Sequence, residues 1–354
     1  MITMDEKNVR FLGRTYYHKE SAATYFNWTC SGFEFQFEGT KAEAELVTLE
    51  EHARECNLRA FVAVFVNDSD EPYKRFCIDK AKDWYTLFEA KEVAIYKIKV
   101  LKITEAQFGS VGLSRIRIEG IPKSLPEKPL RHKIEFIGDS ITCGYGNEAK
   151  SPEVLFRTNE ENGWEAFAAK TSRKLNCEFN CVSSSGIGIY SSYTGTDNIN
   201  DTMLMPKLYN YTDRFFEQSL GRTSFEEWNF STYVPDLIVI NLGTNDGSYI
   251  KYKEERKLNF RELYIKFLKQ VREKNGAYPK ILCTIGSIDL SLYDEIAAAV
   301  EEYSAETCDT AIDIMKFELQ LEADGIGGSF HPSIATHEKM SAKLCSKIKE
   351  YMNW

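Results

Sequence analysis

The sequence contains no long apolar run. No segment of its 354 residues approaches the roughly 18 consecutive apolar residues that a membrane helix needs. The first residues, MITMDEKNVRFLG, show neither the basic start nor the apolar core of a secretory signal peptide. We therefore expect a cytoplasmic protein, or a secreted one whose leader has been removed.

The sequence also lacks an excess of positive charge, with 44 lysine and arginine residues against 53 aspartate and glutamate residues, and its cysteines form no pattern. The formal net charge is −9 and no cluster of lysine and arginine stands out, so neither nucleic acid nor a membrane is an expected partner. The nine cysteines are scattered, and the nearest pair, Cys177 and Cys181, lacks CxxC spacing. This pattern predicts reduced thiols and no structural metal. The composition leaves the oligomeric state open, a homo-oligomer included.

Residues 1–122 show a period-two alternation of apolar and polar side chains, which is typical of β-strands. Gly39 stands between the first two alternating segments and is expected to turn the chain there. Several short strands with turns between them predict a β-sandwich domain. The alternating segments are 33–37, 42–46, 61–68, 93–103 and 114–121.

Residues 123–133 read as an interdomain linker, because prolines and charges there prevent a continuing helix or central strand. In residues 134–354, apolar strand-like runs alternate with helical stretches, which predicts a parallel sheet covered by helices on both faces. In such a sheet the ligand site lies beyond the carboxyl ends of the strands. The expected strands are 134–137, 177–182, 236–243 and 280–286, and the expected helices are 164–175, 254–275, 289–306 and 332–352.

The strongest chemical signal is the run IEFIGDSITCGYG at 134–146. The strand ends there, Gly138 permits a tight turn, and Asp139 can cap the helix that Ser140 opens. The Ser140 hydroxyl would then lie at the sheet edge, with its own N–H pointing at a developing oxyanion. The alternative is that Ser140 only caps the helix.

Two other loops follow predicted strands. In NLGTNDG, Asn245 can aim its side-chain NH₂ at the same oxyanion or simply close a turn, and Asp246 would stabilise that loop. In SSSGIGIY, Gly186 can bring its backbone N–H close to a substrate oxygen, or be an ordinary loop glycine. Residues 183–185 are rival serine nucleophiles, but they lack the strand-Gly-Asp-Ser setting.

The search for a general base is short, because the chain has five histidines. His18 and His52 lie in the β half and His132 lies in the linker. His337 falls inside the last predicted helix, where a solvated face is expected. His331 follows a glycine-rich loop, from which its imidazole can reach the serine. An ordinary loop-to-helix histidine is the alternative.

Taken together, the blocks Gly-Asp-Ser, Gly, Gly-x-Asn-Asp and His-Pro resemble the SGNH (GDSL-type) hydrolase superfamily. The GDSITCGYG and HPSxxTHEKM forms, with a β half before them, resemble carbohydrate esterase family 2. Its members pair a jelly-roll domain with a flavodoxin-like α/β SGNH domain and deacetylate plant polysaccharides. The resemblance implies Ser140 as nucleophile, His331 as base, and an oxyanion hole made by the Ser140 N–H, the Gly186 N–H and the Asn245 side chain.

One position departs from that family. Many members carry Asp two residues before the histidine, where this sequence has Ser329, and relatives with Asp three residues before meet Gly328. Loss of such an orienting carboxylate costs about 10⁴ in kcat in serine proteases. We expect a dyad, in which a backbone carbonyl of residues 327–329 accepts the imidazole Nδ1–H. A remote carboxylate such as Asp324, or a loss of activity, is the alternative.

These residues predict acyl transfer that needs no metal or organic cofactor. The resemblance implies that the acyl group is the acetyl of an oligo- or polysaccharide, removed by an acetyl xylan esterase-like enzyme. The alternatives are a non-catalytic carbohydrate-binding protein, and a lipase or thioesterase of the same superfamily, which would require a long apolar groove. Aromatic side chains near the strand ends are the expected sugar contacts: Tyr145, Trp164, Tyr190, Tyr193, Trp228 and Phe330.

Overall fold

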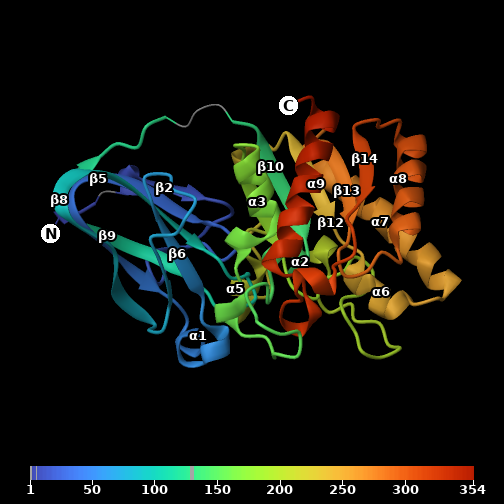
Figure 1. Ribbon diagram of the computed structural model, residues 1–354, viewed down its shortest axis with the longest axis horizontal. Coiled ribbons are helices and arrows are strands. Elements are labelled where there is room, and N and C mark those ends of the chain that lie inside the picture. The colour runs from blue at the N-terminus through green and yellow to red at the C-terminus, as the bar shows by residue number, and fades with distance from the viewer. Residues whose placement is uncertain (1, 5, 128–130) are drawn as a thin grey trace. The chain divides into compact units, whose positions relative to one another are not determined.

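The computed structural model describes residues 2–4, 6–127 and 131–354 (Figure 1). The described chain divides into two compact units. Unit 2 comprises the parallel sheet and its helices, and unit 1 comprises the antiparallel sheet. Within the described residues, no helix is both long enough and apolar enough to cross a bilayer.

Unit 1 is not continuous in sequence. It takes up the chain as far as residue 130, and then two later segments, 157–161 and 212–226. The predicted linker, 123–133, includes residues 128–130, which lie outside the described residues. No sequence pattern indicates that these two later segments pack with the first unit.

The strands of unit 1 form a nine-stranded antiparallel sheet in the order β3-β4-β9-β5-β8-β6-β7, with β1 paired to β9 and β2 to β5. Its strands are β1 (Ile2–Thr3), β2 (Val9–Leu12), β3 (Tyr16–His18), β4 (Ala23–Tyr25), β5 (Gly32–Val47), β6 (Phe61–Val66), β7 (Lys74–Cys77), β8 (Lys82–Lys102) and β9 (Gly112–Lys123). Its helices are η1 (Glu6–Asn8), α1 (Glu50–Arg54), η2 (Cys56–Leu58), η3 (Thr158–Glu160) and α5 (Arg214–Ser219).

The expected turn at Gly39 is wrong. Segments 33–37 and 42–46 belong to one long strand, β5, which continues through two irregularities of register. Gly39 pairs with Gly120 of β9, and a Cβ on Gly39 would lie 2.0 Å from the carbonyl oxygen of Glu119. Glycine therefore permits the close approach of two strands here rather than a reversal of the chain.

Unit 2 is built on a five-stranded parallel sheet in the order β11-β10-β12-β13-β14, which is the 2-1-3-4-5 order of a flavodoxin-like sheet. The strands are β10 (Lys133–Gly138), β11 (Glu178–Ser183), β12 (Leu237–Asn241), β13 (Lys280–Ile285) and β14 (Ile312–Lys316). The first four were predicted. The sequence reading missed β14, whose run IDIMK carries two charges and is not the continuous apolar run of a central strand.

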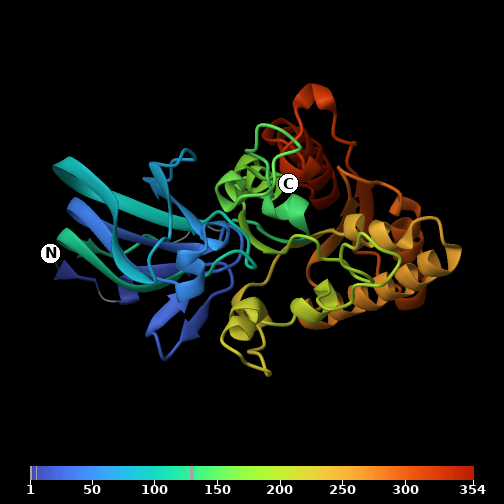
Figure 2. The same cartoon turned by 90° about the horizontal axis from the view of Figure 1, so that it is seen from below.

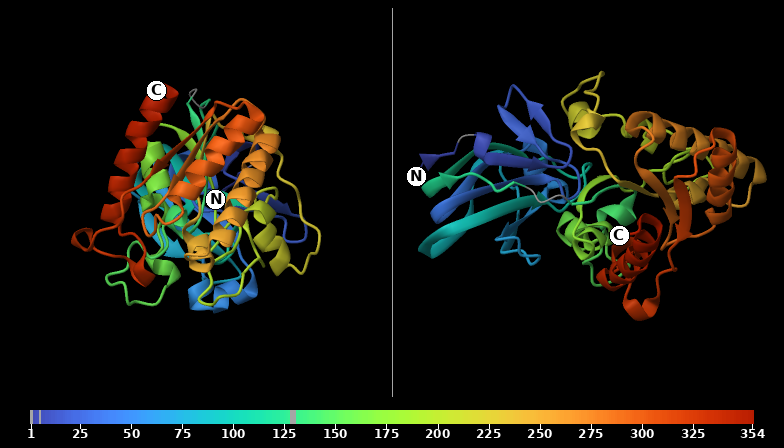
Figure 3. Two further views of the ribbon diagram at one scale, coloured as in Figure 1. Left: turned by 90° about the vertical axis from the view of Figure 1, so that its right-hand side faces the viewer. Right: turned by 90° about the horizontal axis from the view of Figure 1, so that it is seen from above.

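Helices cover both faces of this parallel sheet, with α3 and α9 on one face and α7 and α8 on the other (Figure 3). Phe136 and Leu282 of the sheet share an apolar core with Phe167 of α3 and Leu344 of α9. The helices are α2 (Ser140–Cys143), η4 (Gly163–Glu165), α3 (Phe167–Lys174), α4 (Met205–Leu208), η5 (Phe230–Thr232), α6 (Thr244–Ile250), α7 (Glu254–Asn275), α8 (Tyr293–Thr307), η6 (Glu322–Asp324), η7 (Gly328–Phe330) and α9 (Ile334–Met352).

The strand order creates a switch point between β10 and β12, from which the chain continues in opposite directions across the sheet. Ligands of open α/β sheets bind at such a point, beyond the carboxyl ends of the strands. Figure 2 looks toward this edge, where the loops after β10, β11 and β12 gather. Ser140, Gly186 and Asn245 follow these three strands in turn.

Candidate active site

Ser140 and His331 meet at the carboxyl edge of the parallel sheet. Ser140 Oγ lies 2.8 Å from His331 Nε2, although 191 positions separate the two residues in the sequence. Ser140 is the first residue of α2, and the Asp139 side chain caps that helix by accepting the Ile141 N–H at 3.0 Å. Capping by Asp139 leaves the Ser140 hydroxyl available to the imidazole.

The imidazole is oriented by a backbone carbonyl. His331 Nδ1 lies 3.0 Å from the carbonyl oxygen of Ser329, an atom that can only accept a hydrogen bond. The proton therefore belongs on Nδ1, which leaves Nε2 to accept the hydrogen bond of the Ser140 hydroxyl. Ser329 and Phe330 have φ angles of 51° and 61°, the left-handed region, which turns this carbonyl back toward the ring.

Asp324, the remote carboxylate considered from the sequence, is engaged elsewhere. Both of its carboxylate oxygens accept from Lys339 Nζ at 2.7 Å. Its backbone carbonyl accepts the Ser333 hydroxyl at 2.8 Å, next to the start of α9. The alternative in which Asp324 orients the imidazole is therefore wrong, and the contact present is the one expected for a dyad.

The Ser140 and Gly186 N–H groups are open to a negatively charged oxygen. Ser140 opens α2, so its N–H has no carbonyl one turn earlier in the helix to receive it. Gly186 has a φ of +76°, and within the described part of the chain no acceptor takes its N–H. A side chain on Gly186 would be strained at this φ, which explains why glycine suits the position.

Asn245 lies close to the same edge, in the first turn of α6. Its Nδ2 donates to the Ile187 carbonyl oxygen at 2.9 Å and makes a longer contact of 3.3 Å with Asp139 Oδ2. The first bond fixes the plane of the amide. The second N–H makes only the longer contact, so it is the one for which an oxyanion can compete.

Asp246 organises the loop that follows Gly186. Its buried carboxylate accepts the backbone N–H groups of Ile189, Tyr190 and Ser191. Burial raises the pKa of Asp246 to about 6, and the three N–H groups oppose that rise. Asp246 therefore stabilises this loop, as expected from the sequence, because its side chain accepts hydrogen bonds from three consecutive backbone N–H groups.

Three of the expected sugar contacts are accessible. Tyr145 is half-buried, with its ring against that of His331 at a centroid distance of 4.5 Å. Phe330 is 60% exposed and Tyr193 is 63% exposed. Tyr190 is half-buried, with its hydroxyl accepting a long hydrogen bond from Asn259.

Trp164 does not suit that role, whereas nothing in the structure decides the part of Trp228. Trp164 is 4% exposed and the Arg173 guanidinium lies 4.2 Å from its ring centroid, which contradicts a sugar contact there. The Trp228 N–H donates to the Asn210 carbonyl, and the preceding Tyr209 bonds Glu135 near the amino end of β10. The Trp228 side chain is half-buried, and a sugar contact there stays a prediction.

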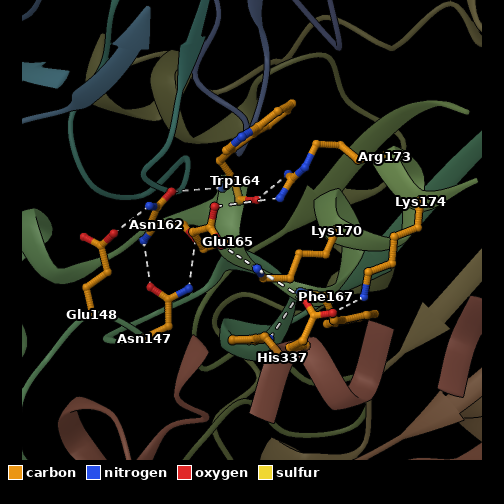
Figure 4. Close-up of polar contacts among 11 residues, drawn as sticks. Asn147, Glu148, Asn162, Trp164, Glu165, Phe167, Lys170, Arg173, Lys174 and His337 are labelled. Carbon is orange, nitrogen blue, oxygen red and sulfur yellow. Dashed lines mark hydrogen bonds and ion pairs between the residues drawn. The ribbon is translucent and has the colours of Figure 1, made fainter. Parts of the chain in front are cut away.

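His337 was expected on a solvated helix face, and this expectation is wrong. The residue is fully buried, and its Nδ1 accepts the Phe167 N–H at 3.2 Å (Figure 4). Burial lowers the pKa of His337 to about 3, so the ring is neutral at ordinary pH. Because α3 has no side-chain cap of its own, this imidazole supplies an acceptor for its first N–H.

Two residues of the site were not found from the sequence. Gly146 accepts the Gly328 N–H at 2.9 Å, and a Cβ on Gly146 would lie 2.8 Å from the Gly328 carbonyl oxygen. Phe156 stacks on Tyr145 with centroids 3.8 Å apart. The glycines of the GYG and GGS runs could have indicated the contact between Gly146 and Gly328. No local sequence pattern indicates the stacking of Phe156 on Tyr145.

Comparison with known families gives two matches that together span most of the chain. A family described as GDSL-like lipase/acylhydrolase matches residues 134–344. A family described as carbohydrate esterase 2 N-terminal matches residues 11–127. The first match covers the parallel sheet and every residue of the Ser140 and His331 site, and the second covers most of the antiparallel sheet.

Individual relatives agree with these matches. Cellulase/esterase CelE of Acetivibrio thermocellus is 32% identical over 331 residues, which are 92% of this chain and 38% of that protein. This chain thus spans well under half the length of that relative. A solved family two carbohydrate esterase from Clostridium thermocellum, in complex with cellohexaose, is 30% identical with a TM-score of 0.85, covering 98% of this chain and 99% of that one.

A second solved structure shares the fold at lower sequence identity. The acetyl xylan esterase Est2A from the rumen bacterium Butyrivibrio proteoclasticus is 20% identical with a TM-score of 0.86, covering 99% of this chain and 97% of that one. At this identity the likeness establishes the fold alone. Both units are thus shared with proteins of known structure.

Proposed function

The chain belongs to the GDSL-like lipase/acylhydrolase family and carries a carbohydrate esterase 2 N-terminal domain, and from this premise we propose that it is a serine esterase that removes acetyl groups from oligo- or polysaccharides, as an acetyl xylan esterase does. The observation that carries the proposal is the 2.8 Å contact between Ser140 Oγ and His331 Nε2. The dyad stands at a sheet edge where ligands of such folds bind.

The mechanism begins with proton transfer. His331 Nε2 takes the hydroxyl proton as Ser140 Oγ attacks the acetyl carbonyl carbon. The carbonyl oxygen becomes an oxyanion, which the Ser140 N–H, the Gly186 N–H and the Asn245 amide receive. The imidazolium then gives its proton to the departing sugar oxygen, which leaves an acetyl group on Ser140 Oγ.

The second half repeats these steps with water. Neutral His331 accepts a proton from water as the water oxygen attacks the acetyl carbon, and the same donors receive the second oxyanion. Its collapse breaks the bond to Ser140 Oγ, and His331 returns the proton to that oxygen as acetate leaves. Throughout, the Ser329 carbonyl keeps the ring in the Nδ1–H form when neutral.

The acetylated carbohydrate substrate is part of the proposal. It is supported by the printed names of relatives: a cellulase/esterase, and a family two carbohydrate esterase solved with cellohexaose. The exposed rings of Tyr193 and Phe330 supply apolar faces of the kind on which sugar rings stack. We also propose that the curled antiparallel sheet of unit 1 is the jelly-roll typical of such enzymes.

A single assay separates the rival functions. We expect hydrolysis of a chromogenic acetyl ester and release of acetate from acetylated xylo-oligosaccharides, with octanoyl esters cleaved far more slowly. Binding of the oligosaccharide without acetate release would indicate a non-catalytic carbohydrate-binding protein. Preference for the octanoyl ester would indicate a lipase or thioesterase.

Asn245→Ala is expected to lower kcat by roughly 10²–10³ with little change in KM, because one donor to the oxyanion is lost only when that charge develops. The measurement is steady-state kinetics on the chromogenic acetyl ester. Asn259→Ala serves as the control, since that amide makes only a 3.4 Å contact with the Tyr190 hydroxyl. If kcat of the Asn245 variant equals that of the wild type, Asn245 merely shapes the turn.

The pH dependence of kcat/KM should report the imidazole. Burial lowers the pKa of His331 below its ordinary value of 6.5, while the Ser329 and Gly328 carbonyls oppose this shift. The base acts when neutral, so activity should fall as the pH drops through the pKa of His331, and the midpoint of this acid limb should lie below pH 6.5. An acid limb with its midpoint above 6.5 would mean that another group, or a charged partner of the imidazole, controls the reaction.

A further inference from the structure

The Tyr145 ring, beside the nucleophile, contacts two other aromatic rings. Its centroid lies 4.5 Å from that of the His331 ring at an interplanar angle of 42°, and 3.8 Å from that of the Phe156 ring at 13°. Tyr145 therefore packs against both Phe156 and the imidazole. The proposed mechanism uses His331 and gives no part to Tyr145 or to Phe156.

The positively charged form of the His331 imidazole requires stabilisation, which the face of the Tyr145 ring can supply. It must carry a positive charge midway through each half-reaction, yet its Nδ1 faces only the uncharged Ser329 carbonyl. Within the described residues no carboxylate lies at ion-pair distance from His331. The face of an aromatic ring attracts a cation at such a distance, and more strongly where water is excluded.

The backbone on both sides of Tyr145 is fixed. Asn147 and Asn162 bond each other reciprocally, since Asn147 Nδ2 donates to the Asn162 carbonyl at 2.9 Å and the Asn162 N–H donates to Asn147 Oδ1 at 3.1 Å (Figure 4). On the other side, the Gly146 carbonyl accepts the Gly328 N–H of the histidine loop. Tyr145 thus directly precedes Gly146, whose contact with Gly328 holds the loop that carries His331.

We propose that Tyr145, backed by Phe156, is a positioning residue that stabilises the imidazolium form of His331 and so replaces, in part, the carboxylate that related triads use. This inference rests on the proposed function, because the charge it stabilises arises in that mechanism. It assigns the Tyr145 ring to His331 rather than to the sugar, which was the contact expected from the sequence.

No carboxylate is among the groups that shift the pKa of His331: burial lowers it, and only the Ser329 and Gly328 carbonyls oppose that shift. His337 of α9 is held neutral by burial. Asp139, at the start of α2, accepts from the Ile141 N–H and from Asn245. Asp324, on the histidine loop, is paired with Lys339.

The test uses the full chain with Tyr145→Phe and Tyr145→Leu, and measures the pKa of His331 by NMR titration of the imidazole. Phenylalanine keeps the aromatic face, so its pKa should match the wild type. Leucine removes the face, and the pKa should fall by roughly half to one unit. If the ring only shielded the imidazole from water, its removal would raise the pKa, and that result would overturn the proposal.

Kinetics supply the second readout. On a chromogenic acetyl ester without a sugar, Tyr145→Leu should lower kcat about tenfold and move the acid limb to lower pH, while Tyr145→Phe stays within about threefold of the wild type. Tyr252→Leu is the matched control, because Tyr252 is 94% exposed. A loss confined to KM for acetylated oligosaccharides would assign Tyr145 to sugar binding instead and contradict the proposal.

The two readouts keep this inference separate from the proposed function. An enzyme without acetyl ester activity would refute the function, whereas the NMR titration would still show whether the aromatic face raises the pKa of His331. Conversely, full activity with equal pKa values in all three proteins would leave the esterase intact and refute the part given to Tyr145.

Discussion

Ser140→Ala should abolish acetyl ester hydrolysis, with a loss in kcat on the order of 10⁶, the scale seen when a catalytic serine is removed. The reason is that no other hydroxyl lies in hydrogen-bond contact with His331 Nε2 among the described residues. The fold should persist, because Asp139 rather than Ser140 caps α2. Kinetics with the chromogenic ester and thermal unfolding followed by circular dichroism measure the two effects.

The control for that experiment comes from the rival serines. Ser185→Ala alters a half-buried serine that immediately precedes Gly186 and is expected to retain most of the activity. Substantial turnover by Ser140→Ala, with loss in the Ser185 variant, would transfer the nucleophile to the second loop. A Ser140→Ala protein with a lower unfolding midpoint than the wild type would also lose activity through unfolding. The two thermal unfolding midpoints must therefore match before the kinetics of the two proteins are compared.

His331→Ala is expected to cause a loss of similar size, because without its base the Ser140 hydroxyl is a weak nucleophile. The double variant Ser140→Ala/His331→Ala should lose no more than either single variant, since residues that act as a unit are far from additive. The loop should keep its path, because the His331 carbonyl still accepts the Gly327 N–H at 2.8 Å. Losses that multiply in the double variant would show that the two side chains act independently.

His337→Ala separates this prediction from a general effect of removing a buried histidine. His337 bonds the Phe167 N–H, and its loss should lower the unfolding temperature. Its effect on kcat should be small beside that of His331→Ala. A loss of activity equal to that of His331→Ala in a folded protein would assign His337 a direct part in the chemistry.

The positions of Ser140, Gly186 and Asn245 at one sheet edge could be predicted from the sequence, because each depends on the strand just before it. Ser140, Gly186 and Asn245 each follow a buried apolar strand, and parallel strands bring their carboxyl ends to one edge. The Ser329 carbonyl was also foreseeable, because the missing carboxylate left a backbone group of the same loop as the nearest acceptor. The pattern of parallel strands, rather than any single motif, predicts that Ser140, Gly186 and Asn245 lie close together.

Features that depend on tertiary packing were not predictable. His337 is a polar residue inside a predicted helix, which favours a solvated face, yet the packing of α9 on α3 buries it. Gly39 has the local signature of a turn, but its partner Gly120 lies eighty residues away in β9. Trp164 has the local sequence setting expected of a sugar contact, but the guanidinium of Arg173, on the next helix, lies over its ring.

The central claim is that Ser140 Oγ carries the acetyl group between substrate and water. Rapid mixing with a chromogenic acetyl ester, acid quenching and intact-protein mass spectrometry test it directly. We predict a mass increase of one acetyl group within the first turnover, located by peptide fragmentation to Ser140 and absent from Ser140→Ala. Acetate release with no acetylated protein, or with the acetyl group on another residue, would contradict the account.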